Sequence, residues 1–394
     1  MMFRRARDAA KGRGNQREAP LLRPNLPALP GPAYGSGTLG DLFGSIGAHL
    51  GMRSSDVFGL PAARRYVVLM VDGLGWEQLG EYGTHAGPLG AASGARPIAV
   101  GLPTTTVTSL ASLGTGLTPG RHGMVGHSFR LDDIRFAPLR TTPYVYALDV
   151  QPQLTWFERF TKAGVSANVV APATFTTSLF TGAVLRGARF LGVGDEHDVE
   201  GIVQAATIAA SIGDVSVTYV YMRSLDQAGH LAGLGSEPWL DALRFAGTLT
   251  DALRAALPRD TLLLVTGDHG IVNVPMQPRT VIEQVPALAA GVEMVAGEAR
   301  FRHLYAAPRD VAGVVQRWEN ELGDTAWVRT REEAIADGWF GPVPERMAAR
   351  IGDVVVAAQG TSAVFTITHE RELQLRGMHG SFTPAEMLVP LLWL

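Results

Sequence analysis

Four short apolar runs, each followed at once by a small polar motif, constrain the fold of this chain more than any other feature. The segments read RRYVVLMVDGLG from residue 64, ANVVAPATF from 167, VSVTYVYMRSLD from 215 and TLLLVTGDHG from 261. Continuous apolar runs of this length are typical of strands buried on both faces of a parallel sheet. Helical stretches such as PWLDALRFAGTLTDALRAAL, residues 238–257, lie between them. The alternation predicts an α/β fold, a three-layer sandwich with helices on both faces of a central, mostly parallel sheet.

Composition and charge exclude several classes of protein. The chain has 394 residues, of which 46% are apolar and only 18% charged, so it can bury a large core. A net charge of −3 gives no reason to expect a stable complex with nucleic acid or an anionic membrane. No apolar run approaches the roughly 20 residues of a membrane span, and none follows Arg4 and Arg5 as a signal peptide requires, which predicts a cytoplasmic protein. Cysteine is absent, so any metal must be held by His, Asp, Glu or hydroxyl groups.

Changes of pattern along the chain divide it into a lead, a core and a cap. Residues 1–35 carry scattered charge and several prolines, which predicts a flexible lead. The segment TLGDLFGSIGAHLG then has helical spacing and predicts a first helix that ends at Gly51. Residues 36–275 and 376–394 carry the strand and helix pattern of a catalytic core. The shorter mixed segments of residues 276–375 predict an inserted α+β cap.

Acidic residues and histidines follow the ends of the predicted strands. Asp72, Asp226 and the adjacent pair Asp268 and His269 each come directly after an apolar run. Ligands of α/β proteins bind just past the carboxyl ends of the strands, which is where these side chains fall. Asp72 alone is equally compatible with a helix cap for WEQLGEYG. Adjacent Asp and His at a strand end is a rarer arrangement and favours a metal site.

Two further histidines complete a candidate metal centre. In DQAGH the i, i+4 spacing places Asp226 and His230 on one helical face. His379 lies between glycines in RGMHGSF, where a lone histidine is usually an ordinary loop residue. Three imidazoles and three carboxylates at one sheet edge are a ligand set for a dication such as zinc or manganese. With a threonine as seventh ligand, two ions fit this set better than one.

The segment TTTVTS, residues 104–109, is too rich in hydroxyls for a core strand and leads into apolar Leu110, Ala111 and Leu113. It is therefore a helix cap, a source of a nucleophilic hydroxyl, or both. A hydroxyl at a helix start beside a dication is easily deprotonated, and the helix N-terminus also favours the phosphate that the hydroxyl would attack.

These motifs together resemble the alkaline phosphatase superfamily and, within it, the nucleotide pyrophosphatase/phosphodiesterase branch, the type I phosphodiesterases. Members have a strand-terminal Asp in a DG motif, a segment like PTxTFPN followed by T-G-x-x-P-x-x-H-G, then D-x-x-G-H, D-H-G and a late H-G. This chain has VDGLG, PTTTVTS, TGLTPGRHG, DQAGHLAG, GDHG and MHGSF in the same order, over roughly residues 65–394.

The resemblance implies an alkaline-phosphatase-like sandwich with two divalent ions, most often zinc, with manganese possible. It makes Thr106 the nucleophile. By the same resemblance, one ion would be held by Asp72, Thr106, Asp268 and His269. The other ion would be held by Asp226, His230 and His379.

The segment departs from the family where the asparagine of PTxTFPN, which helps to bind a phosphate oxygen, is replaced by Ser109. A serine hydroxyl can still donate but has a shorter reach, so Ser109 is a candidate substrate-binding residue. His122, in the GRHG that follows, is flanked by turn residues and is interpreted as structural.

The predicted function is therefore metal-dependent hydrolysis of phosphodiester or nucleotide pyrophosphate-type bonds through a phosphothreonine intermediate, with a small phosphoester as substrate. A phosphomonoesterase or phosphonate hydrolase with the same two metals is the main alternative, since Arg121, Arg130 and Arg223 could supply the extra cations that it needs. A metal-binding interaction protein without catalysis is less favoured, because it has no need for the Thr106 hydroxyl. The oligomeric state does not follow from the sequence.

Overall fold

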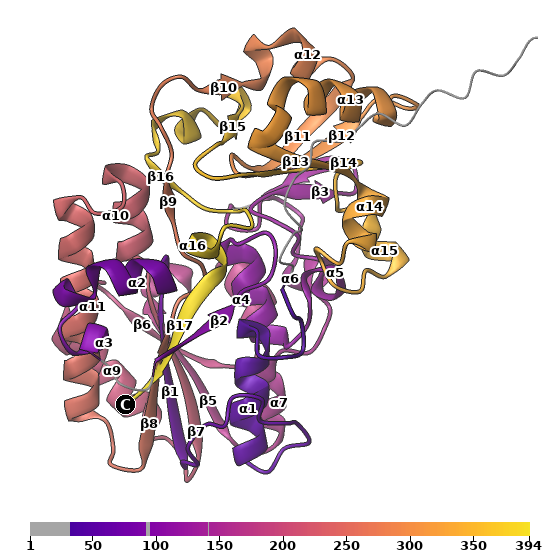
Figure 1. Ribbon diagram of the computed structural model, residues 1–394. Coiled ribbons are helices and arrows are strands. Elements are labelled where there is room, and N and C mark those ends of the chain that lie inside the picture. The colour runs from indigo at the N-terminus through magenta and orange to yellow at the C-terminus, as the bar shows by residue number, and fades with distance from the viewer. Residues whose placement is uncertain (1–31, 92–94, 141) are drawn as a thin grey trace, which may run out of the picture.

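The computed structural model describes residues 32–91, 95–140 and 142–394, and a seven-stranded sheet forms its centre (Figure 1). Strand β1 pairs in parallel with β7 and β8, and β5 pairs in parallel with β6 and β7. Only β17 runs antiparallel to its neighbours, β2 and β8. In spatial order the strands are β2 (Arg96–Ala99), β17 (Leu388–Trp393), β8 (Thr261–Thr266), β1 (Arg65–Val71), β7 (Ser216–Met222), β5 (Ser166–Pro172) and β6 (Arg189–Val193).

Helices cover both faces of this sheet, which explains why its strands are apolar throughout. Alternate residues of β1 enter different cores: Tyr66 and Val68 pack in one, Val67 and Leu69 in the other. On the first side lie α1 (Leu42–His49), α4 (Thr106–Thr115), α7 (Trp156–Lys162) and α8 (Leu179–Val184). On the second side lie α2 (Trp76–Tyr82), α3 (Pro88–Ala91), α9 (Val199–Ala210), α10 (Ser224–Ala232) and α11 (Glu237–Ala256). The predicted three-layer α/β architecture is confirmed.

A second, antiparallel sheet stands at the carboxyl end of the parallel strands (Figure 1). One of its faces, with Phe301 and Val355, joins the core cluster around α4, and the other, with Leu304 and Val354, packs against α13. This α+β unit is therefore packed onto the core through shared apolar side chains. Its strands in order are β11 (Val292–Glu298), β12 (Phe301–Ala306), β14 (Val354–Ala358) and β13 (Ala326–Thr330), and its helices are α12 (Pro286–Ala289), α13 (Val311–Leu322), α14 (Arg331–Ala336) and α15 (Glu345–Ala348).

Short elements join the two units. The chain leaves the core after β9 and returns at β16, and these two segments pair with each other, so that Asn273 faces Gly377. The short strand pairs are β3 (Phe129–Leu131) with β4 (Ile134–Phe136), β9 (Val272–Asn273) with β16 (Gly377–Met378), and β10 (Thr280–Val281) with β15 (Val364–Phe365). The short helices are α5 (Pro119–His122), α6 (Ala147–Val150) and α16 (Pro384–Met387), and the 3₁₀ turns are η1 (Leu39–Asp41), η2 (Gly83–His85), η3 (Ala173–Phe175), η4 (Ile282–Gln284), η5 (Gly323–Thr325) and η6 (Ile367–Gln374).

The predicted lead, residues 1–35, lies outside the described residues up to position 31. Within its last residues, the Tyr34 hydroxyl donates to the Trp339 carbonyl at 2.7 Å and accepts from the Leu102 amide at 3.2 Å. The helix predicted to end at Gly51 appears as η1 followed by α1, which ends at His49.

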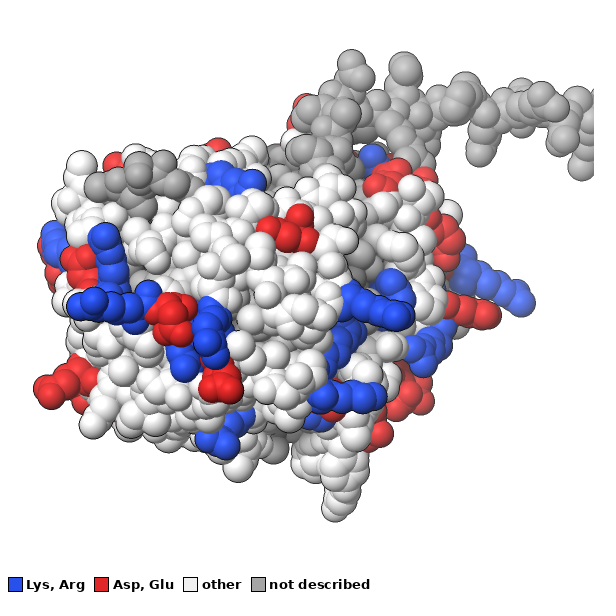
Figure 2. Space-filling view, turned by 90° about the horizontal axis from the view of Figure 1, so that it is seen from below, with Lys and Arg blue, Asp and Glu red and all other residues white. Residues whose placement is uncertain are grey.

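The face at the opposite end of the sheet from the cap carries acidic and basic side chains singly and in small groups, separated by uncharged surface (Figure 2). On this face no extended surface of a single sign is visible outside the undescribed residues. Among the described residues, no helix is both long and apolar enough to cross a membrane.

Candidate two-metal active site

The ends of β1 and β8 bring together a first, almost fully buried group, Asp72, Asp268 and His269, called here the buried triad. The Nε2 atom of His269 lies 3.3 Å from Oδ1 of Asp72 and 3.7 Å from Oδ2 of Asp268. The Gly73 amide donates to Oδ1 of Asp268 at 3.0 Å, which ties the two strand ends together. Asp72 does not cap the following helix, because Gly75 occupies the N-cap position of α2.

A second group, Asp226, His230 and His379, lies beside it and is called here the cavity triad. Asp226 and His230 share one face of α10, and Oδ2 of Asp226 lies 3.2 Å from Nε2 of His230. His379 comes from the segment that returns from the cap, and its Nε2 lies 3.3 Å from that of His230. The rings of His269 and His379 stack with centroids 3.7 Å apart, so the two triads are in contact.

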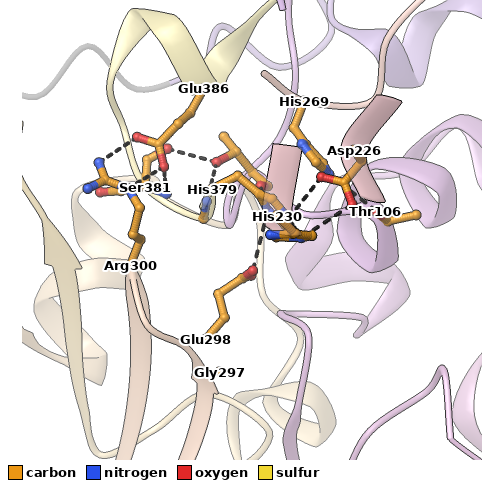
Figure 3. Close-up of polar contacts among 12 residues, drawn as sticks. Thr106, Asp226, His230, His269, Gly297, Glu298, Arg300, His379, Ser381 and Glu386 are labelled. Atoms are coloured by element: carbon orange, nitrogen blue, oxygen red, sulfur yellow. Dashed lines mark hydrogen bonds and ion pairs between the residues drawn. The ribbon is translucent and has the colours of Figure 1, made fainter. Parts of the chain in front are cut away.

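Thr106 is the first residue of α4, and Thr105 is the N-cap. Its hydroxyl oxygen lies 3.4 Å from both carboxylate oxygens of Asp72 and 3.3 Å from Nε2 of His269. In Figure 3 the Thr106 side chain points toward the histidines and Asp226. The hydroxyl-rich segment therefore begins a helix and also places one hydroxyl against the buried triad.

All three imidazoles are held in the same way. Their Nδ1 atoms lie 2.8 to 3.0 Å from the main-chain oxygens of Gly270, Gly377 and Thr104, for His269, His230 and His379 respectively. An Nδ1–H that donates to a carbonyl leaves a lone pair on Nε2, which is the tautomer that binds a metal. Burial, followed by repulsion from His269 and His230, also lowers the pKa of His379 well below its ordinary value. With Nδ1 held by the main chain, each ring turns its Nε2 atom toward the site.

Among the described residues, no arginine or lysine forms an ion pair with the carboxylates of the two triads, whose ion-pair contacts are all with histidines. Oδ2 of Asp268 and Oδ1 of Asp226 are buried and accept no hydrogen bond. Burial, and then repulsion from Asp268 and Asp226, raises the pKa of Asp72 well above its ordinary value. Buried charged oxygens are normally paired or coordinate a metal. Two divalent cations would satisfy these oxygens and reverse the repulsion, so the residues fit a bimetallic centre.

Three residues near the triads were not predicted from the sequence. The Tyr221 hydroxyl, at the end of β7, donates a hydrogen bond to Oδ2 of Asp72. Glu298, at the end of β11 in the cap, has Oε2 3.3 Å from Nδ1 of His379, and burial raises its pKa well above the usual value. His127 lines a cavity next to His230 and His379. Only Tyr221 had a sequence signal, because it lies in the apolar run that leads to Asp226.

A buried ion pair attaches the cap next to these ligands (Figure 3). Both Arg300, between β11 and β12, and Glu386, in α16, are fully buried, and two guanidinium nitrogens lie 2.7 Å from the two carboxylate oxygens. Glu386 also accepts from the Ser381 amide at 3.0 Å, two residues after His379. This bidentate contact fixes the Glu298 end of the cap against the His379 loop.

Two cavities open beside the triads. An apolar cavity of about 460 Å³ lies next to Asp72 and Thr106. Its walls include Leu139, Phe175, Phe180, Phe190 and Tyr221. A more polar cavity of about 870 Å³ lies between core and cap and shares His230 and His379 with the cavity triad. The two triads thus lie where the two cavities approach each other, since His230 lines both.

The remaining residues singled out in the sequence lie away from the triads or are already paired. Ser109 is fully buried with no partner for its hydroxyl and lines neither cavity, so its substrate-binding role stays a prediction. His122 is buried, contacts Ser112 at 3.0 Å and accepts from the Met124 amide, in keeping with a structural role.

The three arginines considered for a monoester site differ in their surroundings. Arg223 lines the apolar cavity but is paired with Glu196 at 2.6 and 2.8 Å. Arg130 lies over the ring of Tyr305, 4.5 Å from its centroid, and Arg121 is exposed.

Several solved structures share this fold at low sequence identity. Murine ectonucleotide pyrophosphatase/phosphodiesterase 5, as an inactive threonine-to-alanine variant in complex with AMP, matches with a TM-score of 0.65 and 16% identity over 83% of this chain and 87% of that one. The human protein of the same name matches with a TM-score of 0.63 and 17% identity over 84% and 87%. Phosphonoacetate hydrolase from Sinorhizobium meliloti in complex with phosphonoformate matches with a TM-score of 0.64 and 16% identity over 84% and 90%.

Comparison by sequence identifies the family. No curated protein matches the chain significantly. The profile of the type I phosphodiesterase/nucleotide pyrophosphatase family, however, matches residues 66–382, which include both triads and Thr106. The chain therefore belongs to the type I phosphodiesterase/nucleotide pyrophosphatase family of hydrolases, in the alkaline phosphatase superfamily.

Proposed function

We propose that the protein hydrolyses phosphodiester or nucleotide pyrophosphate-type bonds, with Thr106 as nucleophile. The observation that carries the proposal is the position of the Thr106 hydroxyl, at the start of α4 and within 3.4 Å of Asp72 and His269. A helix N-terminus offers free amide groups and a positive dipole to a phosphate. The threonine therefore lies where a phosphorus atom would be bound.

Each of the two steps forms one bond to phosphorus and breaks another. In the first, the Thr106 hydroxyl gives its proton to solvent, a bond forms between Thr106 Oγ and phosphorus, and the bond to the leaving oxygen breaks, so that this oxygen keeps the electron pair. In the second, water adds to phosphorus and the bond to Thr106 breaks, which releases a monoester and restores the hydroxyl. The intermediate is phosphothreonine.

Metal ions complete this site. Asp72, Asp268, His269 and the Thr106 hydroxyl would hold one ion, and Asp226, His230 and His379 the other. Imidazole nitrogens with carboxylate and hydroxyl oxygens suit Zn²⁺, with Mn²⁺ as the alternative. Two such ions, when bound, lower the pKa of the hydroxyl and stabilise charge on the attacking and departing oxygens.

The cavities and the charges beside Thr106 favour a diester over a monoester. A diester carries an organic group on each side of phosphorus, and a cavity lies beside each triad. A monoester carries about one more negative charge and needs an added cation. Arg223 is the arginine that lines the apolar cavity, and Glu196 already binds it through two hydrogen bonds.

A substrate panel tests the proposal. Bis-p-nitrophenyl phosphate, p-nitrophenyl-TMP, p-nitrophenyl phosphate and phosphonoacetate would be compared, with metal content measured on the same sample. We expect a higher kcat/KM for the two diesters than for the matched monoester. A monoester preference of about tenfold, equal to about 1.4 kcal/mol in the barrier, would refute the diester assignment.

A further inference from the structure

The apolar cavity is lined by Thr106 itself, which limits the part of a substrate that can occupy it. In an in-line displacement the leaving oxygen departs on the side of phosphorus opposite the attacking oxygen. The larger cavity is lined by His230 and His379 but not by Thr106. The leaving group is therefore expected in the larger cavity, and the group that stays on phosphorus is expected in the apolar cavity.

The wall of the apolar cavity continues the hydrophobic core of the protein. Phe180 of α8, Leu110 of α4 and Ala171 of β5 line the cavity and belong to one core cluster. Phe190 of β6 and Leu185, which follows α8, line it and pack against the same cluster. The volume of about 460 Å³ falls in the usual range of ligand pockets. Such a wall favours an apolar group that displaces water.

Several polar side chains of this wall already have partners. The Ser178 hydroxyl donates to the Thr181 hydroxyl at 2.9 Å and accepts from the Thr181 amide at 3.0 Å. Two nitrogens of Arg223 donate to the carboxylate of Glu196, and the guanidinium lies 5.4 Å from the ring centroid of Phe175. These groups are therefore engaged with the protein and not with a ligand.

Few polar groups of the wall remain for the organic part of a ligand. The Tyr221 hydroxyl donates to Asp72, whereas the Tyr219 hydroxyl is buried without a hydrogen-bond partner, and Gln227 is exposed. One buried hydroxyl can meet one polar atom, but the edge of a nucleobase carries several donors and acceptors. A nucleobase in this cavity would lose hydrogen bonds to water that the wall does not replace, which is costly.

The apolar surface extends to the outside of the protein. Leu139 and Leu231 of α10 both line the cavity, and they are 51% and 64% exposed. A flexible chain longer than the cavity would therefore continue over leucine side chains, whereas a rigid ring system would not reach them.

We infer that the apolar cavity binds an alkyl chain on the group that stays on phosphorus, so that the substrates are amphiphilic diesters. The inference rests on the proposed function and narrows its substrate class. Leu110, Leu185 and Phe190 would contact the chain, and Leu139 and Leu231 would cover its outer part. An alkyl chain needs no hydrogen bonds, so its burial is favourable without the cost that a nucleobase would incur.

A series of 4-nitrophenyl alkyl phosphates tests this subsite, because every member releases the same 4-nitrophenolate. The ethyl, butyl, hexyl and octyl esters would be compared with 4-nitrophenyl-TMP at concentrations below those at which the esters aggregate. We expect kcat/KM to rise with chain length and to be at least about tenfold higher for the octyl than for the ethyl ester, since burial of about two methylenes gives that factor. The octyl ester should also exceed 4-nitrophenyl-TMP.

Binding of the product measures the subsite without turnover. Hydrolysis of these esters releases the alkyl phosphate, which keeps the chain. Isothermal titration calorimetry of the metal-loaded protein should give an affinity at least about tenfold higher for octyl phosphate than for ethyl phosphate. The heat capacity change should be more negative for octyl phosphate, as burial of apolar surface requires. Equal affinities would contradict the inference.

Two leucine variants locate the preference. Leu185→Gln places an amide in the cavity wall and should reduce the octyl-to-ethyl ratio of kcat/KM several-fold, mainly through KM. Leu179→Gln is the matched control, because Leu179 begins the same helix and packs half-buried against the same core cluster but lines neither cavity. It should leave the ratio unchanged. Melting temperatures of both variants would show that they fold.

The outcomes separate the inference from the proposed function. Turnover of the ethyl ester and of 4-nitrophenyl-TMP with no gain from chain length would overturn the inference and leave the proposed function intact. A higher kcat/KM for 4-nitrophenyl-TMP than for the octyl ester would do the same, because the cavity would then prefer a nucleoside. An equal fall of the ratio in Leu179→Gln would also overturn the inference. Hydrolysis of p-nitrophenyl phosphate without hydrolysis of any diester would refute both.

Discussion

The buried triad and the cavity triad consist of the same kinds of side chain, carboxylates and imidazoles, but come from different parts of the fold. Asp268 and His269 are completely buried, and the buried triad comes from the ends of two neighbouring parallel strands. In the cavity triad the side chains of Asp226 and His230 are 15% and 24% exposed, and His379 arrives from beyond the cap. The first triad is thus part of the sheet, whereas the second depends on a helix, a returning segment and the cap. We expect substitutions in the buried triad to be poorly tolerated. We expect the cavity triad to influence substrate preference and the exchange of a bound ion.

The largest expected effect is the loss of activity on removing the Thr106 hydroxyl, which lies beside the buried triad and not the cavity triad. Thr106→Ala should lower kcat by about a thousandfold or more, because the hydroxyl beside the buried triad is lost while the fold remains. Thr106→Ser keeps a hydroxyl and should retain measurable turnover. Burst and steady-state kinetics with bis-p-nitrophenyl phosphate would measure both. If Thr105→Ala proved to be the inactive variant instead, the nucleophile would be misassigned by one residue.

Metal content should next distinguish the triads. Asp268→Asn and Asp226→Asn should each bind about one ion per chain fewer than the unchanged protein. Activity should fall further in Asp268→Asn, because an ion held by the buried triad would lie beside Thr106. Elemental analysis after dialysis, together with kcat, would test this. Two ions per chain in both variants, or full activity in a chelated sample, would contradict the two-metal centre.

Residues that contact the triads from outside should have smaller effects on metal affinity and activity, and the effect should be larger at the buried triad than at the cavity triad. Tyr221→Phe removes the hydrogen bond to Asp72 and should lower metal affinity or activity by about 10- to 100-fold. Glu298→Gln should cost less, because the Thr104 carbonyl still accepts from Nδ1 of His379 at 2.9 Å. Titration against a zinc buffer would give both affinities. A larger loss for Glu298→Gln would show that the cap, rather than the sheet, controls metal binding.

Acid stability should show the smallest effect, and it concerns a histidine outside both triads. Burial lowers the pKa of His122 from 6.5 to about 3, so the folded protein holds it neutral. The unfolded chain takes up a proton below about pH 6.5, so this contribution to the free energy of unfolding is lost as pH falls from about 6.5 toward 3. Urea unfolding of the chelated protein should show a weaker decline over that range for His122→Gln than for the unchanged protein.

Exposed His85 provides the control for that measurement. His85→Gln should leave the pH dependence of unfolding as it is. If His122→Gln and the unchanged protein lost stability in parallel, His122 would be protonated in the folded state, against its burial.

The sequence was sufficient for the parts of the site that lie at strand ends. Asp72 and Asp268 follow apolar runs, and parallel strands place their carboxyl ends at one edge, so their proximity follows from local patterns. Asp226 and His230 follow from helical spacing on α10. His379 needed the family resemblance, because nothing local distinguishes it from a loop histidine.

Residues contributed by the cap and its contacts could not be predicted in this way. Glu298 lies in the segment VEMVAGE, which reads as an ordinary strand, and its contact with His379 depends on how the cap packs on the core. Ser109 is buried within α4, and its substrate-binding role, which came from a motif position, stays a prediction.

The hydrogen bond between His379 and the Thr104 carbonyl joins residues 275 positions apart in the chain. A ribosome that has made residues 1–375 has already supplied Thr106, the buried triad and the entire cap, but not the third ligand of the cavity triad. Strand β17, which fills the place between β2 and β8, is also still missing at that stage. Until then the nascent chain contains the buried triad but not the complete cavity triad. The returning segment therefore completes both the cavity triad and the central sheet, after the whole cap has been made.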